Sequence, residues 1–444
     1  MENKDMQERP SSSASSHEKI TQDQLEALVR LHNRFIDGRL GGRRADLRNA
    51  DLSGLSLRGE NLRQANFMGC IMVGMDLSGA NFQEASLYAC DLSNANLYRT
   101  VFTRADLRGA RIVNANLIGA NLEAADLRVG AISNGTNYDS GQMVNFRGAN
   151  LSGARLMGAM ASRADFSDAI LVGANMSKAD FAGAQLEGAD LSGAEINGAT
   201  FKGANLKSAI MTGVDLKELE DKGIDLSGAV TDKNVGTSVK DMGLPLAQMI
   251  DTHKSWVESA GKAGKQLDLS GIDLRALQSL KMEKMTAIKG VGAKFFGMNL
   301  YKIELQSAVL DEADFRNCDM EAADLRGTSF KRANFSHAKL RNANCGSLLF
   351  GEGSGTRRFS PTNFESAKLR YADLSGTQMK GALFNGADLS YANFTGADLR
   401  DADFTGATLN MTVLDNCQTD GAKFDKADKP VFKFAGKAGA EDQG

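Results

Sequence analysis

Cysteine and histidine are the side chains in this sequence best able to bind a metal or to act as nucleophile and base. The 444 residues contain five cysteines and four histidines. Cys70 and Cys90 fall at the same place in successive copies of a repeat described below, so a disulfide or a two-thiolate metal site is an alternative to packed free thiols. No other cysteine or histidine shares their register. We therefore expect free thiols in a reducing compartment, with no metal and no cofactor.

The histidines are too widely spread to build a catalytic group. They are His17, His32, His253 and His337. None has a serine, cysteine or carboxylate at a spacing that is typical of nucleophilic catalysis. The sequence therefore predicts a protein that is not an enzyme.

The elements that would position these residues follow a period of five. Residues 391–409 read YANFTGADLRDADFTGATL, with a large apolar residue at Phe394, Leu399, Phe404 and Leu409. A helix, with about 3.6 residues per turn, or a strand, with a repeat of about two, cannot bury such a pattern on one face. A chain that turns a corner at this interval can, because each short side then points its large residue toward a common axis.

The phenylalanines indicate how many sides make one turn. Many of them are spaced by four such intervals: Phe295, Phe315 and Phe335; Phe364, Phe384, Phe404 and Phe424; and the pairs Phe82/Phe102, Phe146/Phe166, Phe181/Phe201 and Phe330/Phe350. Four intervals correspond to four sides of one turn. We therefore expect a square coil in which similar residues stack in columns.

The repeated unit resembles that of a known family. The runs ADLRNADLSG, GANLEAADLRV and GADLSYANFTGADLRDADF look like the A-(D/N)-L-x-x motif of pentapeptide repeat proteins. The resemblance covers about residues 45–230 and 267–428. It implies an all-β solenoid, a right-handed quadrilateral parallel β-helix, which agrees with the square coil. Such a motif is specific for fold and says little about function.

Each array is preceded by a predicted helix. Thr21 and Gln24 form a capping box before an apolar helical face that carries His32. A similar face recurs at residues 246–257, where His253 takes the place of His32. Because the ends of a solenoid expose apolar core, we expect two tandem units, each a capping helix followed by a solenoid. Both histidines are interpreted as buried packing residues, with pH sensing or ligand binding as the alternative.

The period breaks once in each array, at corresponding places in the two arrays, which predicts a loop at equivalent heights. The expected organisation is a disordered tail at 1–19, a capping helix at 20–40, a first solenoid at 41–231 with a loop at 133–145, a linker at 232–266 with the second capping helix, a second solenoid at 267–428 with a loop at 351–363, and a C-terminal tail at 429–444.

The two loops are the candidate partner-binding sites, through Tyr138, Arg357, Arg358 and Phe359. The alternative is that both are tolerated insertions. The sequence predicts a non-enzymatic scaffold or adaptor that binds an unidentified protein partner by its flat faces and loops. A homodimer through one solenoid end is a further expectation.

Net charge bears on the other functions considered. The chain carries −3 with a pI of about 6.0, so we expect no direct nucleic-acid binding. Some pentapeptide repeat proteins mimic duplex DNA and modulate DNA gyrase, and this is the alternative function. However, DNA carries one charge per ~1.7 Å, whereas acidic residues only slightly outnumber basic residues in the first array. A metal- or small-molecule-binding protein is a third hypothesis, and a filled core argues against it.

Cellular location is inferred from two observations. No apolar run is long enough to span a bilayer. The N-terminal stretch MENKDMQERPSSSASSHEK lacks an apolar signal segment. The expected location is the cytoplasm.

Overall fold

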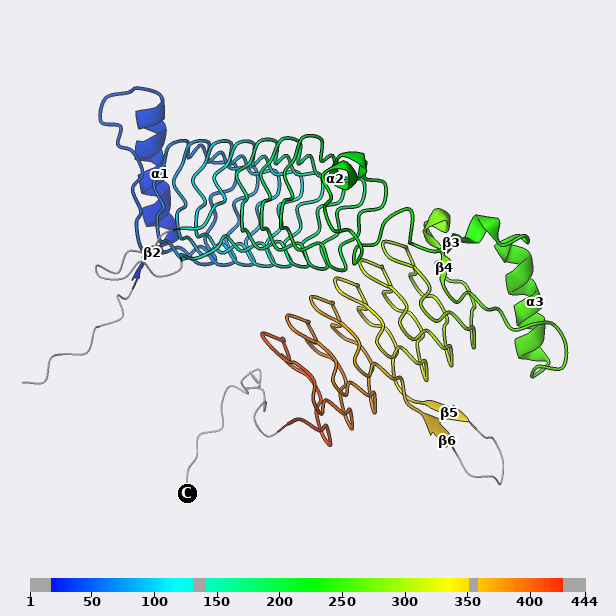
Figure 1. Ribbon diagram of the computed structural model, residues 1–444. Helices are drawn as coiled ribbons and strands as arrows, with labels where there is room; N and C mark the ends of the chain where they lie inside the picture. The colour runs from blue at the N-terminus through cyan, green and yellow to red at the C-terminus, as the bar shows by residue number, and fades with distance from the viewer. Residues whose placement is uncertain (1–16, 131–140, 351–357, 426–444) are drawn as a thin grey trace, which may run out of the picture. The chain divides into compact units, whose positions relative to one another are not determined.

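The computed structural model describes residues 17–130, 141–350 and 358–425. The chain divides into two compact units, a first unit of residues 1–232 and a second unit of residues 233–444. Figure 1 shows a stack of narrow coils in each unit. Within the described ranges, no helix is long and apolar enough to cross a membrane.

Parallel β-bridges join residues at the same place in successive coils of both units. In the first unit, Asn66 pairs with Ser86, and Ser86 pairs with Asp106. Such bridges recur at every fifth residue, so that one coil has four short sides. Most central apolar residues also donate their N–H to the next coil, as from Phe67 to the Ser86 carbonyl at 2.8 Å. These bonds satisfy the backbone along the axis, and the predicted coil of four sides is confirmed.

Phenylalanine rings form continuous columns inside the coils. Phe364, Phe384, Phe404 and Phe424 stack with centroids 5.2, 4.8 and 4.8 Å apart and interplanar angles of 4°, 8° and 4°. The first three rings of this column are buried. Stacked, buried rings contribute both transfer free energy and specific ring contacts. The predicted vertical stacking of this series is therefore confirmed.

One coil in each unit is lengthened by an insertion. Phe330 stacks on Phe364, with ring centroids 5.3 Å apart, and the chain between them is longer than one regular coil. In the first unit, the bridge from Arg111 to Asn145 likewise spans more than one regular coil. The predicted pairing of Phe330 with Phe350 is wrong, because Phe350 belongs to strand β5 (Leu348–Phe350), which leaves the coil.

Thiols replace alanine at some of the inward corners. Cys70 donates to the Leu47 carbonyl at 2.5 Å, and Cys90 donates to the Phe67 carbonyl at 2.9 Å. The hydroxyl of Thr100 makes the equivalent bond at 2.8 Å. All five cysteines are free, and burial raises the pKa of the Cys70 thiol to about 11. The corner thiols of Cys70 and Cys90 therefore serve as buried hydrogen-bond donors between coils.

The first coil of the first unit is extended by a short strand. Strand β1 (Glu18–Lys19) pairs in parallel with β2 (Ala50–Asp51). Glu18 and Lys19, which were expected to belong to a disordered tail at 1–19, lie in this strand instead, and residues 1–16 lie outside the described residues. The N–H of Ile20 continues this pairing by donating to the Asp51 carbonyl at 3.1 Å.

Helix α1 (Gln22–Ile36) follows β1 and lies against the first coil (Figure 1). The predicted capping box is present, because the Thr21 hydroxyl accepts the Gln24 N–H and the Gln24 side chain accepts the Thr21 N–H. Leu25 and Val29 are buried and belong to the core of the first unit. The apolar face of α1 thus covers core that the first coil would otherwise expose.

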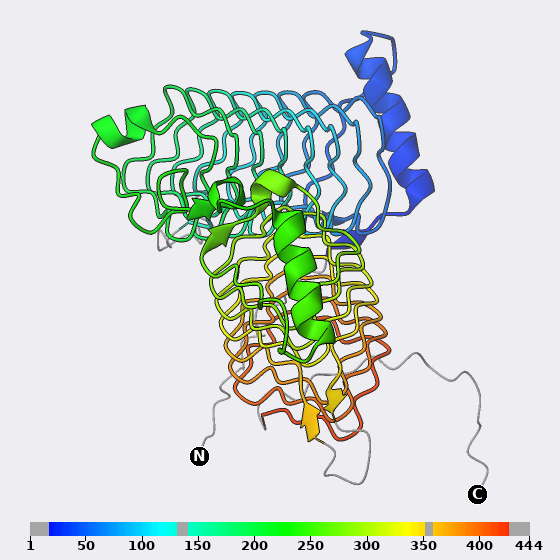
Figure 2. The same ribbon diagram turned by 90° about the vertical axis from the view of Figure 1, so that its right-hand side faces the viewer.

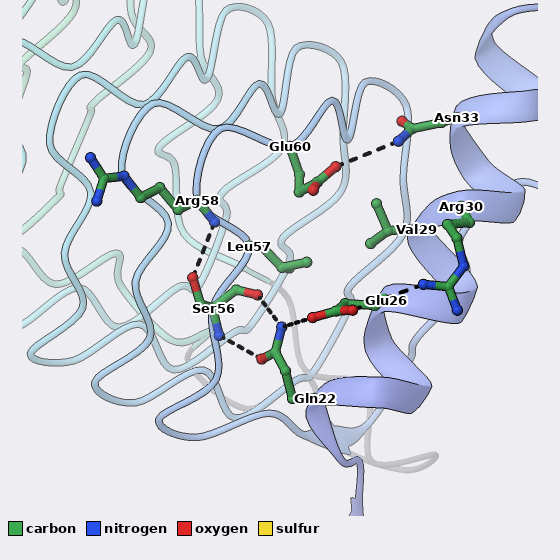
Figure 3. Close-up of a pocket in the computed structure, with 9 residues that line it drawn as sticks. All are labelled: Gln22, Glu26, Val29, Arg30, Asn33, Ser56, Leu57, Arg58 and Glu60. Carbon is green, nitrogen blue, oxygen red and sulfur yellow. Dashed lines mark hydrogen bonds and ion pairs between the residues drawn. The ribbon is translucent and has the colours of Figure 1, made fainter.

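The side-chain amide of Gln22 takes the place of a missing coil (Figure 3). Its Nε2 donates to the Ser56 carbonyl at 3.0 Å, and its Oε1 accepts the Ser56 N–H at 3.0 Å. In later coils the same two backbone groups bond to neighbouring coils. A second contact lies further along α1, where Asn33 Nδ2 donates to Glu60 Oε2 at 3.5 Å. We call the Gln22–Ser56 pair the amide clamp.

A buried histidine fastens each capping segment to its unit. His32 is 0 % exposed, and its Nδ1 accepts the Ala45 N–H at 3.1 Å. In the second unit His253 is 1 % exposed and accepts the Leu267 N–H at 3.1 Å, while its Nε2 lies 2.8 Å from the Thr286 carbonyl. Because the Nδ1 of His32 accepts a hydrogen bond, this ring is held as the neutral tautomer.

Acidification is expected to loosen α1 from the first unit. Burial lowers the pKa of His32 and the charge of Arg44 lowers it further, against an opposing effect of the nearby Arg63 backbone. As the pH falls, the unfolded chain therefore takes up the proton before the folded chain does. The free energy by which neutral His32 stabilises the folded state is thus complete above pH ~6.5 and decreases below it. Hydrogen exchange of the α1 amides, corrected for intrinsic rates, should show a smaller opening free energy at pH 5 than at pH 7. His32→Gln, whose amide can still accept a hydrogen bond, should lose this pH dependence, and an unchanged dependence would contradict the assignment.

The first unit ends, and the second begins, with short irregular elements. Helix α2 (Lys217–Asp221) interrupts the solenoid that was expected to continue to residue 231. Strand β3 (Thr237–Ser238) pairs in parallel with β4 (Ile272–Asp273), as β1 does with β2. The 3-10 helix η1 (Val239–Asp241) then leads toward the second capping segment.

Helix α3 (Leu246–Glu258) covers the first coil of the second unit (Figure 2). Ile250 of this helix belongs to the core of that unit. The 3-10 helix η2 (Arg275–Leu277) adds one residue to the first coil, so Asp268 pairs with Lys289, one position later than the regular period requires. From there the regular period resumes.

Candidate functional site

The insertion of the second unit forms a β-hairpin at a corner of the coil. Strand β5 pairs antiparallel with β6 (Arg358–Ser360), with Leu348 opposite Ser360 and Leu349 opposite Phe359. An inserted segment with its own strand pairing is held in one orientation more firmly than an open loop. The hairpin is therefore a defined projection from the second unit.

The base of the hairpin is anchored to the coil by Thr362. The Thr362 side chain is 0 % exposed, and its Oγ1 lies 3.1 Å from both the Leu325 and Gly346 carbonyls and accepts the Gly327 N–H at 3.0 Å. Gly327 has φ +67°, and a Cβ there would lie 2.9 Å from Leu348 Cβ. The close approach and the left-handed backbone both require glycine at this corner.

Two apolar side chains project from the hairpin. Leu349 is 47 % exposed and Phe359 is 66 % exposed. Because they are directly opposite each other on paired strands, their side chains lie on the same face. An exposed apolar pair on an anchored hairpin is a feature suited to contact with another molecule.

A groove of about 580 Å³ runs between the hairpin and the adjacent side of the coil. Its lining combines polar side chains with one exposed ring: Arg326, Asn344, Gly346, Ser347, Phe359, Gln378, Lys380, Gly381, Asp398 and Asp401. Asn344 and Gln378 are bridge partners in neighbouring coils, and both line the groove. The groove therefore offers hydrogen-bonding groups beside an apolar ring.

The groove contains equal numbers of basic and acidic side chains. Lys380 Nζ lies 3.7 Å from Asp401 Oδ2, with side chains 59 % and 61 % exposed. Arg400 donates to both oxygens of Asp398 at 2.8 and 2.7 Å, and these bonds hold the pKa of Asp398 below its usual value. Exposed pairs of this kind are weak and can exchange partners. The groove can therefore form ion pairs with groups of either sign.

The first unit has an equivalent hairpin base. Gly130 and Gln142 form an antiparallel bridge at the place that Leu348 and Ser360 occupy in the second unit. A Cβ on Gly109 would lie 3.4 Å from Gly130 Cα, which matches the packing of Gly327 against the base of the second hairpin. The predicted equivalence of the two insertions is therefore confirmed at their bases.

The structure places two of the four predicted partner-binding residues. Phe359 lines the groove, and Arg358 lies in β6 opposite Phe350. Tyr138 and Arg357 lie outside the described residues. Lys380 and Asp398 were not predicted, because their position beside the hairpin can be recognised only when the coil register is counted through the insertion. The break in the five-residue period before Phe364 is the sequence signal that could have found them, once the register is continued beyond it.

Some of the charged residues on the sides of the first unit form ion pairs. Arg108 lies 2.8 Å from Asp106 and 3.6 Å from Asp126, and Arg128 lies 2.7 Å from Asp126. Carboxylates and guanidinium groups thus alternate along this side. No group of three or more metal-ligating side chains occurs in the described part of the chain.

Stacked coils joined by parallel bridges define a repeat solenoid, and the family follows from the sequence profile. The chain belongs to the pentapeptide repeat family. The family profile, described as Pentapeptide repeats, matches eight copies at residues 45–84, 85–123, 144–177, 179–217, 291–327, 308–344, 359–386 and 382–418. No curated protein matches significantly.

Similar solved structures carry the same type of repeat. A trypsin-treated variant of QnrB1, a plasmid-mediated fluoroquinolone resistance protein, is 27 % identical over 41 % of this chain and 89 % of its own, with a TM-score of 0.31. HetL, from the cyanobacterium Nostoc sp. strain PCC 7120, is 19 % identical over 91 % and 96 %, with a TM-score of 0.14. A pentapeptide repeat protein from the Arabidopsis thaliana thylakoid lumen is 27 % identical over 34 % and 75 %, with a TM-score of 0.19. The family assignment rests on the repeat profile.

Proposed function

We propose that this chain is a non-enzymatic adaptor that binds a protein partner through the β5–β6 hairpin and the groove beside it. The observation that carries the proposal is the exposed pair Leu349 and Phe359 on a hairpin whose base is fixed by Thr362 and Gly327. A rigid support lowers the entropy that binding would otherwise cost. The right-handed solenoid with its capping helices serves as the frame in this proposal.

The groove defines the chemistry of the proposed partner. A large apolar side chain of the partner would pack against Phe359, and a charged group would exchange with the Lys380–Asp401 pair. Burial of an aromatic ring at the centre of an interface commonly dominates its affinity. We therefore assign the main energetic role to Phe359 and the orienting role to the charged groups. The cytoplasm is the proposed location of this encounter.

Replacing Phe359 by serine should strongly reduce partner capture. Full-length protein would be used to capture partners from native lysate, with recovery quantified by mass spectrometry. A partner bound through Phe359 should be recovered at least about tenfold less by Phe359→Ser, which corresponds to about 1.4 kcal/mol. Met411→Ser is the matched control, since Met411 is 63 % exposed in the same unit and does not line the groove. Equal recovery by wild type and both variants would mean that the hairpin does not bind the recovered partners.

The alternative function, DNA mimicry with modulation of gyrase, has less support than the adaptor function. A DNA mimic needs a dense row of uncompensated negative charge, whereas Asp106 and Asp126 lie 2.8 and 2.7 Å from arginine nitrogen atoms. A supercoiling assay with purified full-length protein distinguishes the two functions. Inhibition or protection of gyrase at micromolar protein concentration would favour the mimic over the adaptor.

A further inference from the structure

The two units cover their first coils differently. His32 and His253 occupy the same place on the two capping helices, and in the same alignment Leu25 corresponds to Leu246. On this alignment Gly243 occupies the position of Gln22. Because α3 begins at Leu246, the helical turn that carries the amide clamp in the first unit is absent from the second.

The missing clamp leaves one edge of the first coil incompletely bonded. Ser279 corresponds to Ser56, because each is the bridge residue of the side that follows the β4 or β2 pairing. Ser56 exchanges two hydrogen bonds with Gln22. The N–H of Ser279 donates locally to the Leu277 carbonyl at 2.6 Å, and no residue of the described ranges donates to the Ser279 carbonyl. This carbonyl is an edge acceptor of the kind that an added strand pairs with.

A pocket with a mainly apolar lining lies beside the same edge, because Leu277, whose carbonyl accepts the Ser279 N–H, forms part of its wall. It has a volume of about 370 Å³ and is lined by Val239, Lys240, Gly243, Leu244, Pro245, Leu246 and Leu277. Leu244 is 55 % exposed, and the other residues that line the pocket with it are mostly apolar. A volume in the range of ~300–1,000 Å³ is typical of sites that bind a ligand group.

We propose that this pocket and the Ser279 edge bind an extended peptide segment of a protein partner. A backbone N–H of the segment donates to the Ser279 carbonyl, and one large apolar side chain enters the pocket between Leu244 and Leu277. The first unit indicates this chemistry, because the Gln22 carboxamide, a donor and acceptor like a peptide amide, completes the equivalent edge. Strand addition combined with a side-chain pocket is a common mode of peptide recognition.

The proposed peptide site differs from the adaptor site in position and composition. It shares no lining residue with the groove at β5–β6. Lys240 in the pocket wall suits an acidic residue in the bound segment, whereas the groove presents both charges. Phe359→Ser should therefore leave peptide binding unchanged. Failure of the adaptor proposal would thus leave the peptide-site proposal standing, and the reverse also holds.

A phage-displayed library of short linear peptides, selected on the full-length protein, provides the probe. Selected peptides should share one large apolar position. Their affinity for Leu244→Ser, measured by fluorescence anisotropy, should be at least about tenfold weaker than for wild type. Met282→Ser is the matched control, since Met282 is 63 % exposed in the same unit and lies outside the pocket, and it should bind as wild type does. N-methylation of the peptide backbone next to the apolar residue should weaken binding to a similar extent, because it removes the N–H that pairs with Ser279.

Several results would overturn the proposal. No enriched peptide, equal affinity of Leu244→Ser and wild type, or full binding by every N-methylated peptide would each exclude strand addition at this pocket. Light scattering provides an independent readout on the protein alone. Self-association that is lost in Leu244→Ser and kept in Met282→Ser would show that a second copy of the chain occupies the site.

Discussion

Phe384→Ala should lower the free energy of unfolding of the second unit by about 3–5 kcal/mol. The Phe384 ring is fully buried and stacks on Phe364 and Phe404 at centroid distances of 5.2 and 4.8 Å. The backbone of each coil is hydrogen-bonded to the coils on both sides, so the cavity left by the ring cannot collapse. The loss can be measured by native-state hydrogen exchange of the amides in these coils, using the full-length protein.

Phe359→Ala is the matched control for this prediction. Its ring is 66 % exposed in the same unit, and truncation of an exposed side chain usually changes stability by less than about 0.5 kcal/mol. A similar loss in both variants would mean that the Phe384 column does not stabilise the solenoid. A large loss in Phe384→Ala alone would connect stability to the internal stack.

The repetitive part of the fold could be predicted because every short side of the coil is subject to the same local constraint. A side has one inward position for a large residue, as at Phe384 and Phe404, and one inward corner that is small, as at Ala402. When a single constraint recurs at a fixed interval, periodicity alone identifies both the coil and its columns. The structure therefore adds little to the sequence in the regular coils.

The insertion could be located from the sequence, but its pairing could not be predicted. Phe350 follows Phe330 by one regular coil period and satisfies the pattern by coincidence. The pairing of β5 with β6 removes it from the coil, and Phe364 takes its place on Phe330. Local strand pairing thus overrides the column pattern. For the same reason, the groove residues Lys380 and Asp398 could not be identified until the register beyond the hairpin was known.

The difference between the two capping segments was also hidden from sequence reasoning. The apolar faces of the two helices are alike, so the sequence predicts equivalent caps. The structure shows that their first turns differ, because Gln22 is helical while Gly243 precedes Pro245 and stays outside α3. An edge contact made by one polar side chain leaves no periodic signal. Such contacts require coordinates of both the helix and the coil.

The second large effect on stability is expected at an ion pair of the second unit. This pair lies outside the apolar core but is almost completely shielded from solvent. The side chains of Arg316 and Asp314 are only 6 % and 8 % exposed, and Arg316 donates to both carboxylate oxygens, at 2.9 and 2.5 Å. Burial by itself would raise the pKa of Asp314, but the charge and hydrogen bonds of Arg316 hold it below its usual value. Arg316→Met should therefore cost about 3–5 kcal/mol at pH 7, because it leaves a buried carboxylate without its partner.

The same motif in an exposed position supplies the control. Arg400 and Asp398 form an equivalent two-bond pair, but their side chains are 41 % and 20 % exposed. Arg400→Met should cost less than about 1 kcal/mol, because water can solvate the remaining carboxylate. Urea unfolding of the full-length variants would measure both losses, and equal losses would contradict a burial effect.

The pH dependence separates an unpaired charge from lost packing in Arg316→Met. Without the guanidinium group, burial should raise the pKa of Asp314 above its value in the unfolded chain, so the folded variant takes up the proton first as the pH falls. Its deficit relative to wild type should therefore shrink between pH 7 and pH 4. Loss of the contact between Arg316 and the Phe296 ring, whose centroid lies 5.9 Å from the guanidinium carbon, would instead leave a deficit that does not change with pH. A constant deficit would thus assign the stabilisation to packing and not to the ion pair.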